Sequence, residues 1–207
     1  MMGRTHAAVA SALYCAYTMP QTVHDVPAWS MGLAIAAFTS LLPDLDEPRS
    51  RIGGMLLPLI PSLLRPAAFC VTGAYLAFVG YKDGVEWLLV AGISLLFLVF
   101  IRHRESPTHG LVGLGMAVAL MYAWKPDYII PVLIGYGSHL ALDIVTEGVS
   151  LFWPIRKRIR IPLTSTNSLL ERWLFYRGAQ LWVLMAILKC FHREVLRPIQ
   201  LFVDRIL

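Results

Sequence analysis

The sequence predicts an all-α protein, a polytopic membrane bundle with four to seven embedded helices. Of the 207 residues, 57% are hydrophobic and 15% are charged, whereas soluble domains average about 45–50% apolar and about 25% charged residues. The apolar residues also gather in long runs, and short polar or proline-containing breaks separate these runs. Finally, histidines and aspartates stand near the ends of several runs, although ionisable groups among membrane helices are costly and usually functional.

The expected helices follow the apolar runs in chain order. Several runs are shorter than the ~20 residues that a full span requires. We expect the short ones to be tilted partners in the bundle, or half-embedded helices around a cavity. The breaks between runs contain proline, glycine or charged residues, which end helices. The runs lie at about 5–19, 28–42, 63–81, 87–101, 109–124, 128–146 and 173–190.

The end of the chain differs from the rest, so we divide it into an embedded domain, residues 1–190, and a tail, residues 191–207. The tail carries apolar residues at helical spacing, with Arg193, Arg197 and Arg205 between them. This pattern is typical of an amphipathic helix in the membrane interface. A helix packed on the bundle would show the same pattern.

The three cysteines give no sign of a disulfide framework or a thiolate metal site. Cys15, Cys70 and Cys190 all lie inside apolar runs, and no pair has Cys-x-x-Cys spacing. An odd and scattered set of this kind is typical of small core or lipid-facing residues.

Imidazoles and carboxylates occur in a pattern that suits a divalent metal. His139 and Asp143 are four residues apart, so they share one face of a helix. Pro43 disfavours regular helix at the following Asp44 and Asp46, which frees both carboxylates to turn towards a shared ion. Mixed ligands of this kind suit zinc first, with manganese or iron as alternatives.

Two further histidines each follow a threonine. In Thr5-His6 and Thr108-His109 we expect the threonine to cap a helix and the histidine to lie in its first turn. A structural, hydrogen-bonded role is an equally good interpretation of His6 taken alone. With these residues the candidate ligands exceed four, which favours two or more ions.

A simple threading brings the candidate ligands together. If successive helices cross the membrane in alternating directions, then His6, residues 44–46, residues 102–109 and Asp143 all reach the same side. This predicts a polar metal pocket near one interface. Most basic residues gather on that side, so the positive-inside rule places the pocket at the cytoplasmic face.

A site of this kind predicts hydrolysis of a phosphoester. Metal ions activate water and hold both oxygens of a phosphoester displacement. Asp44 or Asp46 would bridge ions or act as a base. We expect three arginines to hold the substrate phosphate and three hydroxyls to act as caps or hydrogen-bond partners of the ligands. These residues are Arg104, Arg156 and Arg158, and Thr5, Thr108 and Ser138.

Several segments resemble the YdjM family of bacterial and archaeal inner-membrane proteins. They are Thr5-His6, Leu42-Pro-Asp-Leu-Asp46, Pro107-Thr-His109 and Gly135-Tyr-Gly-Ser-His-Leu-Ala-Leu-Asp143, followed by Trp153-Pro154, and the resemblance covers about residues 1–165. It implies a metal-dependent hydrolase, distantly similar to the superfamily of zinc-dependent phospholipase C and single-strand nucleases. It also implies a metal set of His6, Asp44, Asp46, His109, His139 and Asp143.

One segment departs from the family pattern. The family usually reads His-Arg-Gly-x-Thr-His, but here the stretch from His103 to His109 is one residue longer. Without a gap, Arg104 takes the place of the first histidine, which leaves His103 as a further candidate ligand that would reach the site through a bulge.

We therefore predict that the embedded domain is a membrane-bound metal-dependent hydrolase, with a lipid head group or another small phosphoester as its substrate. Membrane lipid is the expected partner, and nucleic acid is not expected. Two alternatives remain open. One is a transporter or channel that uses the histidines and aspartates to move protons or metal ions. The other is a membrane protein that keeps a metal without catalysis.

Overall fold

The computed structural model describes residues 1–46, 51–99, 107–155 and 157–192. The all-α prediction is confirmed, because the described residues form eight α-helices and their β structure is a single bridge between Val149 and Ile159. The helices are α1 Gly3–Tyr17, α2 Val26–Thr39, α3 Arg51–Leu56, α4 Arg65–Asp83, α5 Glu86–Val99, α6 Leu111–Trp124, α7 Ile129–Ile144 and α8 Gly178–Phe191.

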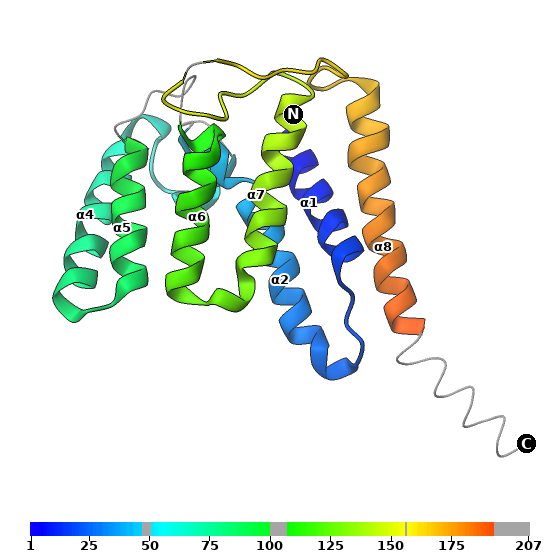
Figure 1. Ribbon diagram of the computed structural model, residues 1–207, viewed down its shortest axis with the longest axis horizontal. Helices are drawn as coiled ribbons and strands as arrows, with labels where there is room; N and C mark the ends of the chain where they lie inside the picture. The colour runs from blue at the N-terminus through cyan, green and yellow to red at the C-terminus, as the bar shows by residue number, and fades with distance from the viewer. Residues whose placement is uncertain (47–50, 100–106, 156, 193–207) are drawn as a thin grey trace, which may run out of the picture.

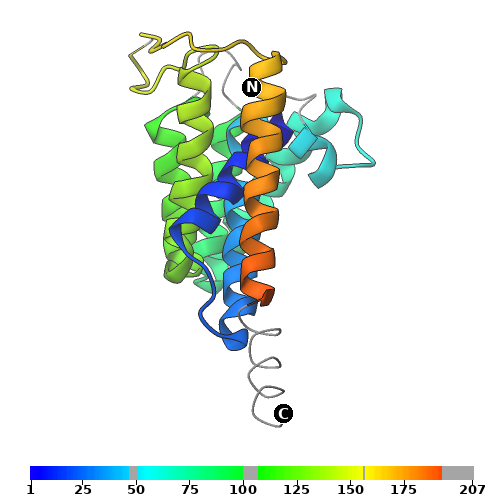
Figure 2. The ribbon, with the colours of Figure 1, turned by 90° about the vertical axis from the view of Figure 1, so that its right-hand side faces the viewer.

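The seven long helices run side by side, with α4 at one edge and α8 at the other (Figures 1 and 2). Helix α7 packs against α1, α2 and α6, and α1 also packs against α8. The start of α1, the end of α2, the start of α6 and the end of α7 all lie at one end of the bundle (Figure 1). The short 3-10 helices η2, Leu42–Asp46, and η5, Pro107–His109, contact each other.

The two predicted threonine caps are wrong. Helix α1 begins at Gly3 with Met2 as its N-cap, so Thr5 already lies inside the helix. Thr108 lies in η5, and the N-cap of α6 is Gly110. Both threonine hydroxyls have other partners, described below. The short helix α3 was also not expected, since residues 51–56 contain two glycines and no clear apolar run.

Two helical segments are long and apolar enough to cross a membrane, judged by length and composition alone. They are Ser62–Asp83, which contains α4, and Glu171–Phe191, which contains α8. Most of their large apolar side chains point away from the bundle, for example Phe78, Trp182 and Met185. Shorter apolar helices lie at Val26–Thr39, Glu86–Phe97 and Leu111–Trp124.

Helices α4 and α5 form a hairpin whose backbones touch. A Cβ atom at Gly80 would lie 2.3 Å from the backbone nitrogen of Leu89, and one at Gly92 would lie 2.3 Å from that of Ala77. Only glycine permits so close an approach, as in other helix pairs packed through small residues. The turn between them uses Gly84, whose φ of 67° is left-handed and ends α4.

A long segment between α7 and α8 lies across the end of the bundle where η2 and η5 are found (Figure 1). It is attached to the helices by backbone hydrogen bonds, from Leu111 N to Leu151 O at 2.9 Å and from Ile161 N to Ile144 O at 2.8 Å. The Arg160 side chain donates to the carbonyl of Thr146 at 2.8 Å. This segment therefore covers the end of the bundle that holds the candidate ligands.

Candidate metal site

The position of His139 is set by close packing between α7 and α2. Gly135, one turn earlier on α7, lies so near α2 that a Cβ atom there would be 2.2 Å from the carbonyl oxygen of Ala36. This approach leaves the carbonyl oxygen of Ser40 2.7 Å from His139 Nδ1. A carbonyl only accepts hydrogen bonds, so Nδ1 must carry the proton, and in the neutral ring Nε2 carries the lone pair. Metal-binding histidines are commonly oriented in this way.

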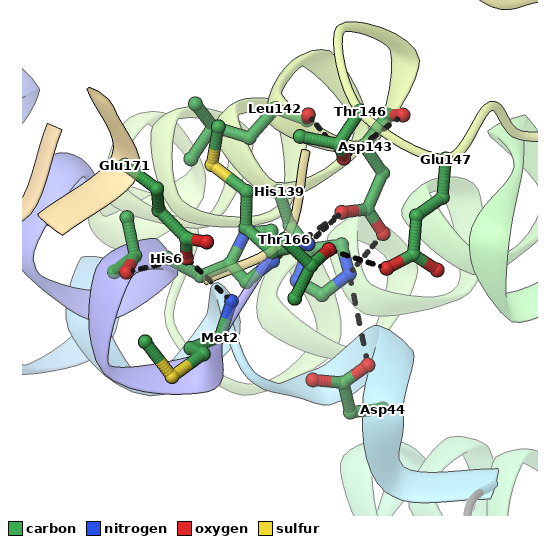
Figure 3. A network of polar contacts seen from close by, with 12 residues as sticks. Met2, His6, Asp44, His139, Leu142, Asp143, Thr146, Glu147, Thr166 and Glu171 are labelled. Atoms are coloured by element: carbon green, nitrogen blue, oxygen red, sulfur yellow. Dashed lines mark hydrogen bonds and ion pairs between the residues drawn. The ribbon is translucent and has the colours of Figure 1, made fainter. Parts of the chain in front are cut away.

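The free nitrogen of His139 faces two carboxylates. Nε2 lies 3.2 Å from Asp143 Oδ2 and 3.9 Å from Asp44 Oδ1 (Figure 3). The ring is fully buried, and among the described residues Nε2 has no hydrogen-bond partner. A lone pair and two anionic oxygens that converge in a buried space repel each other. The arrangement requires a cation between them, either a proton on Nε2 or a metal ion.

His6 brings a second imidazole to Asp143 from the first turns of α1. Its Nε2 lies 3.4 Å from Asp143 Oδ1, and its ring stacks on that of His139 with centroids 3.8 Å apart and planes 17° apart. The α-amino group of Met1 lies 3.0 Å from the same carboxylate oxygen. Two protonated rings stacked at this distance would repel strongly. At least one ring is therefore neutral, which is the form that binds metals.

His109 and Asp44 complete the cluster from η5 and η2. His109 Nε2 lies 3.6 Å from Asp44 Oδ1, and the His109 ring lies 5.4 Å from that of His139. Burial raises the pKa of Asp44, but contact with His109 and the nearby His139 and His6 outweighs this effect and holds the pKa below its usual value. Asp44 is therefore a carboxylate at neutral pH, the state in which it can bind a metal.

The cluster consists of two triads that share one residue. One triad is His6, His139 and Asp143, and the other is Asp44, His109 and His139. In each triad the ligand atoms lie within 4.8 Å of one another, so each could hold a metal ion. His139 has one lone pair, because Nδ1 is committed to Ser40, so it can bind only one ion. Asp143 turns Oδ1 towards His6 and Oδ2 towards His139, and can therefore bridge two ions.

A family model described as "YdjM inner membrane protein" matches residues 1–196. The chain belongs to the YdjM inner membrane protein family. This membership confirms the predicted family and the predicted inner-membrane location.

Two curated YdjM proteins resemble this chain. The inner membrane proteins YdjM of Escherichia coli (strain K12) and of Shigella flexneri are each 29% identical to it over 145 residues. The match covers 67% of this chain and 58% of each relative. No solved structure matches the chain.

In this member of the YdjM family, the structure brings five of the predicted metal ligands into one cluster. They come from α1, η2, η5 and α7, which are far apart in the sequence. Figure 3 labels four of the five, namely His6, Asp44, His139 and Asp143. The side chain of Asp46 and all of His103, Arg104 and Arg156 lie outside the described residues. Arg158 is exposed on the segment between α7 and α8.

The three predicted hydroxyl groups have different partners. Thr108 Oγ1 lies 3.3 Å from Nδ1 of the candidate ligand His109. Ser138 donates at 2.8 Å to the carbonyl of Gly135 in its own helix. Thr5 donates at 2.8 Å to Glu171, so its hydroxyl serves the junction between α1 and the last helix.

Glu171 is a residue that sequence reasoning missed. It begins the π-helical turn η7, Glu171–Arg177, and its side chain is fully buried. Its carboxylate accepts from Met2 N at 2.7 Å, from the Thr5 hydroxyl and from Asn167 N. It therefore fixes the start of α1, and with it His6, to the last helix. The only sequence signal is an acidic residue in the first turn of an apolar run.

Replacing Glu171 with alanine should destabilise the protein by about 1–3 kcal/mol, because three donors lose their acceptor, among them the buried Thr5 hydroxyl. Thermal unfolding in detergent would measure this loss as a lower Tm. Glu147→Ala is the matched control, since the exposed Glu147 accepts, among the described residues, only the hydroxyl of Thr166, at 2.6 Å. Equal Tm values for the two variants would contradict the assigned role of Glu171.

Proposed function

We propose that this protein is a membrane-bound metal-dependent hydrolase that cleaves a phosphoester by a metal-activated water. One observation carries the proposal: the buried Nε2 of His139, which has no hydrogen-bond partner among the described residues, converges with carboxylate oxygens of Asp143 and Asp44 at 3.2 and 3.9 Å. Neutral imidazole and carboxylates in this arrangement are the ligand set of catalytic zinc sites, with manganese or iron as alternatives.

The residues divide into holders of the ion and holders of the substrate. His6, His109, His139 and Asp143 would hold one or more ions. A bound divalent ion lowers the pKa of water and polarises a phosphoryl oxygen. Asp44 is the most accessible ligand of the cluster, with a third of its side chain exposed, so it is suited to bridge ions or to accept the proton of the attacking water. The remaining candidates are Asp46 and His103 as ligands and Arg104, Arg156 and Arg158 as phosphate binders.

The membrane setting favours a lipid head group as the substrate. The large apolar side chains of α4 and α8 point outwards, as lipid-facing residues do. We propose that the shorter apolar helices are also embedded, giving four to seven embedded helices in all. The site would then lie near the cytoplasmic interface, where phosphate head groups are found. No nucleic-acid substrate is expected.

The proposal is tested by hydrolysis of a phosphodiester. Purified protein, loaded with zinc or manganese in detergent, should release product from a chromogenic phosphodiester or a short-chain phospholipid. Asp44→Asn should lower kcat by about 100-fold or more, the scale of a lost proton acceptor. Asp25→Asn is the control, because Asp25 is exposed, lies in the 3-10 helix Val23–Asp25 and accepts from Thr22.

Two results would contradict the hydrolase. One is full turnover by Asp44→Asn, with metal content measured in the same samples. The other is absence of turnover by the metal-loaded protein together with metal uptake by proteoliposomes, which would favour the transporter.

A further inference from the structure

An apolar cavity of about 240 Å³ lies between η2, α5, α6 and α7. Leucine, methionine and alanine side chains make up most of its wall. An apolar cavity of about 150 Å³ stays dry and takes up benzene, so this larger one has room for hydrocarbon. Its lining includes Leu45, Leu95, Met116, Ala117, Leu120 and Tyr136.

This cavity shares its walls with the metal site. Leu42 and Leu45 lie on either side of Asp44 in η2, and Thr108 precedes His109 in η5. Tyr136 lies one helical turn before His139 on the same face of α7. The Tyr136 hydroxyl donates to the carbonyl of Thr108, which ties α7 to η5 between the cavity and the ligands. The polar cluster and the apolar space therefore adjoin across η2, η5 and α7.

We propose that the cavity binds one alkyl chain of an amphipathic phosphoester whose phosphate lies at the histidine–aspartate cluster. An alkyl chain in the cavity would remove its own apolar surface from water, and the apolar wall offers a water molecule few hydrogen-bond partners that could compete. A cation held by the cluster would attract the phosphate at the other end of the same molecule. The assignment of the phosphate rests on the function proposed above, and it narrows the substrate class from any phosphoester to one with a long alkyl chain.

Filling the cavity tests this assignment without touching a metal ligand. Ala117 on α6 lines the cavity, so Ala117→Leu would occupy part of its volume. Ala119, two residues further along, is exposed on the same helix, which makes Ala119→Leu the matched control. Ala91→Leu, on the opposite wall in α5, is a second filling variant if the first does not fold.

The probe is a long-chain alkyl phosphate with a diazirine at the chain end, added to metal-loaded protein in nanodiscs. Cross-linked peptides are identified by mass spectrometry. Labelling should fall on the cavity-lining parts of α5 and α6. It should drop about tenfold in Ala117→Leu and stay unchanged in Ala119→Leu. Unlabelled alkyl phosphate should compete, whereas glycerol phosphate at the same concentration should not.

Labelling confined to the outer faces of α4 and α8, or equal labelling of Ala117→Leu and wild type, would overturn the proposal. If the protein is not a hydrolase, the result is different: the alkyl chain would still label the cavity, but no phosphoester would be turned over. Conversely, turnover of soluble phosphoesters without cavity labelling would contradict the alkyl-chain site but still support the hydrolase.

Discussion

Replacing His139 with alanine is expected to lower divalent-metal affinity by roughly 100-fold or more, since even loss of a group that only orients a ligand costs 10–100-fold. His139 belongs to both triads, and its Nε2 is the atom on which their carboxylates converge. The measurement is metal content after dialysis, by mass spectrometry, together with competition against a chromogenic chelator.

Two further variants make this result interpretable. Asp143→Asn keeps the size of the side chain and should also lose metal, which separates a lost ligand from a collapsed fold. His24→Ala should bind metal as the wild type does, because His24 is exposed and lies in the 3-10 helix Val23–Asp25, outside both triads. If the wild type retains no divalent metal after reconstitution, or if His139→Ala retains as much, the cluster is a proton-linked polar network instead.

The second large effect is expected at Gly135, which lies one helical turn before His139 on α7. In Gly135→Ala the new methyl would lie 2.2 Å from both the Ala36 carbonyl oxygen and the Thr39 hydroxyl. Helix α2 would have to move away, at a cost of about 1–3 kcal/mol. That movement would also lengthen the contact between the Ser40 carbonyl and His139. We therefore expect a lower Tm together with weaker metal binding.

Gly137→Ala is the matched control on the same helix, because nothing lies within 4 Å of a Cβ atom at Gly137. This variant should be neutral or more stable by up to about 1 kcal/mol, the difference in helix propensity between glycine and alanine. Thermal unfolding and chelator competition on both variants provide the comparison. Similar behaviour of the two would show that the close approach of α2 and α7 does not position His139.

Much of the fold could be predicted because apolar runs and their breaks determine helices directly. The seven runs correspond to the seven long helices, with ends that differ by a few residues. The pairing of His139 with Asp143 follows from helical periodicity alone. The meeting of His6, Asp44 and His109 follows from alternating helix direction, which places distant chain segments at the same end of the bundle.

Other parts of the site leave no mark in the sequence. The partner of His139 Nδ1 is a backbone carbonyl, which every residue possesses, so Ser40 could not be recognised. The cap preference of threonine is local, but the Thr5 hydroxyl bonds a carboxylate 166 positions away. The cavity likewise depends on the distances between α5, α6 and α7, which the hydrophobic pattern of the sequence does not determine.

The bond between Thr5 and Glu171 has a consequence for biosynthesis. The first helix leaves the ribosome early, but its start is held in place by a residue near the other end of the chain. Chains emerge and fold from the N-terminus, so the start of α1 gains this anchor only after Glu171 has been synthesised. The histidine–aspartate cluster is thus completed late, and a nascent chain that stops before Glu171 would lack the anchor that holds His6 in position.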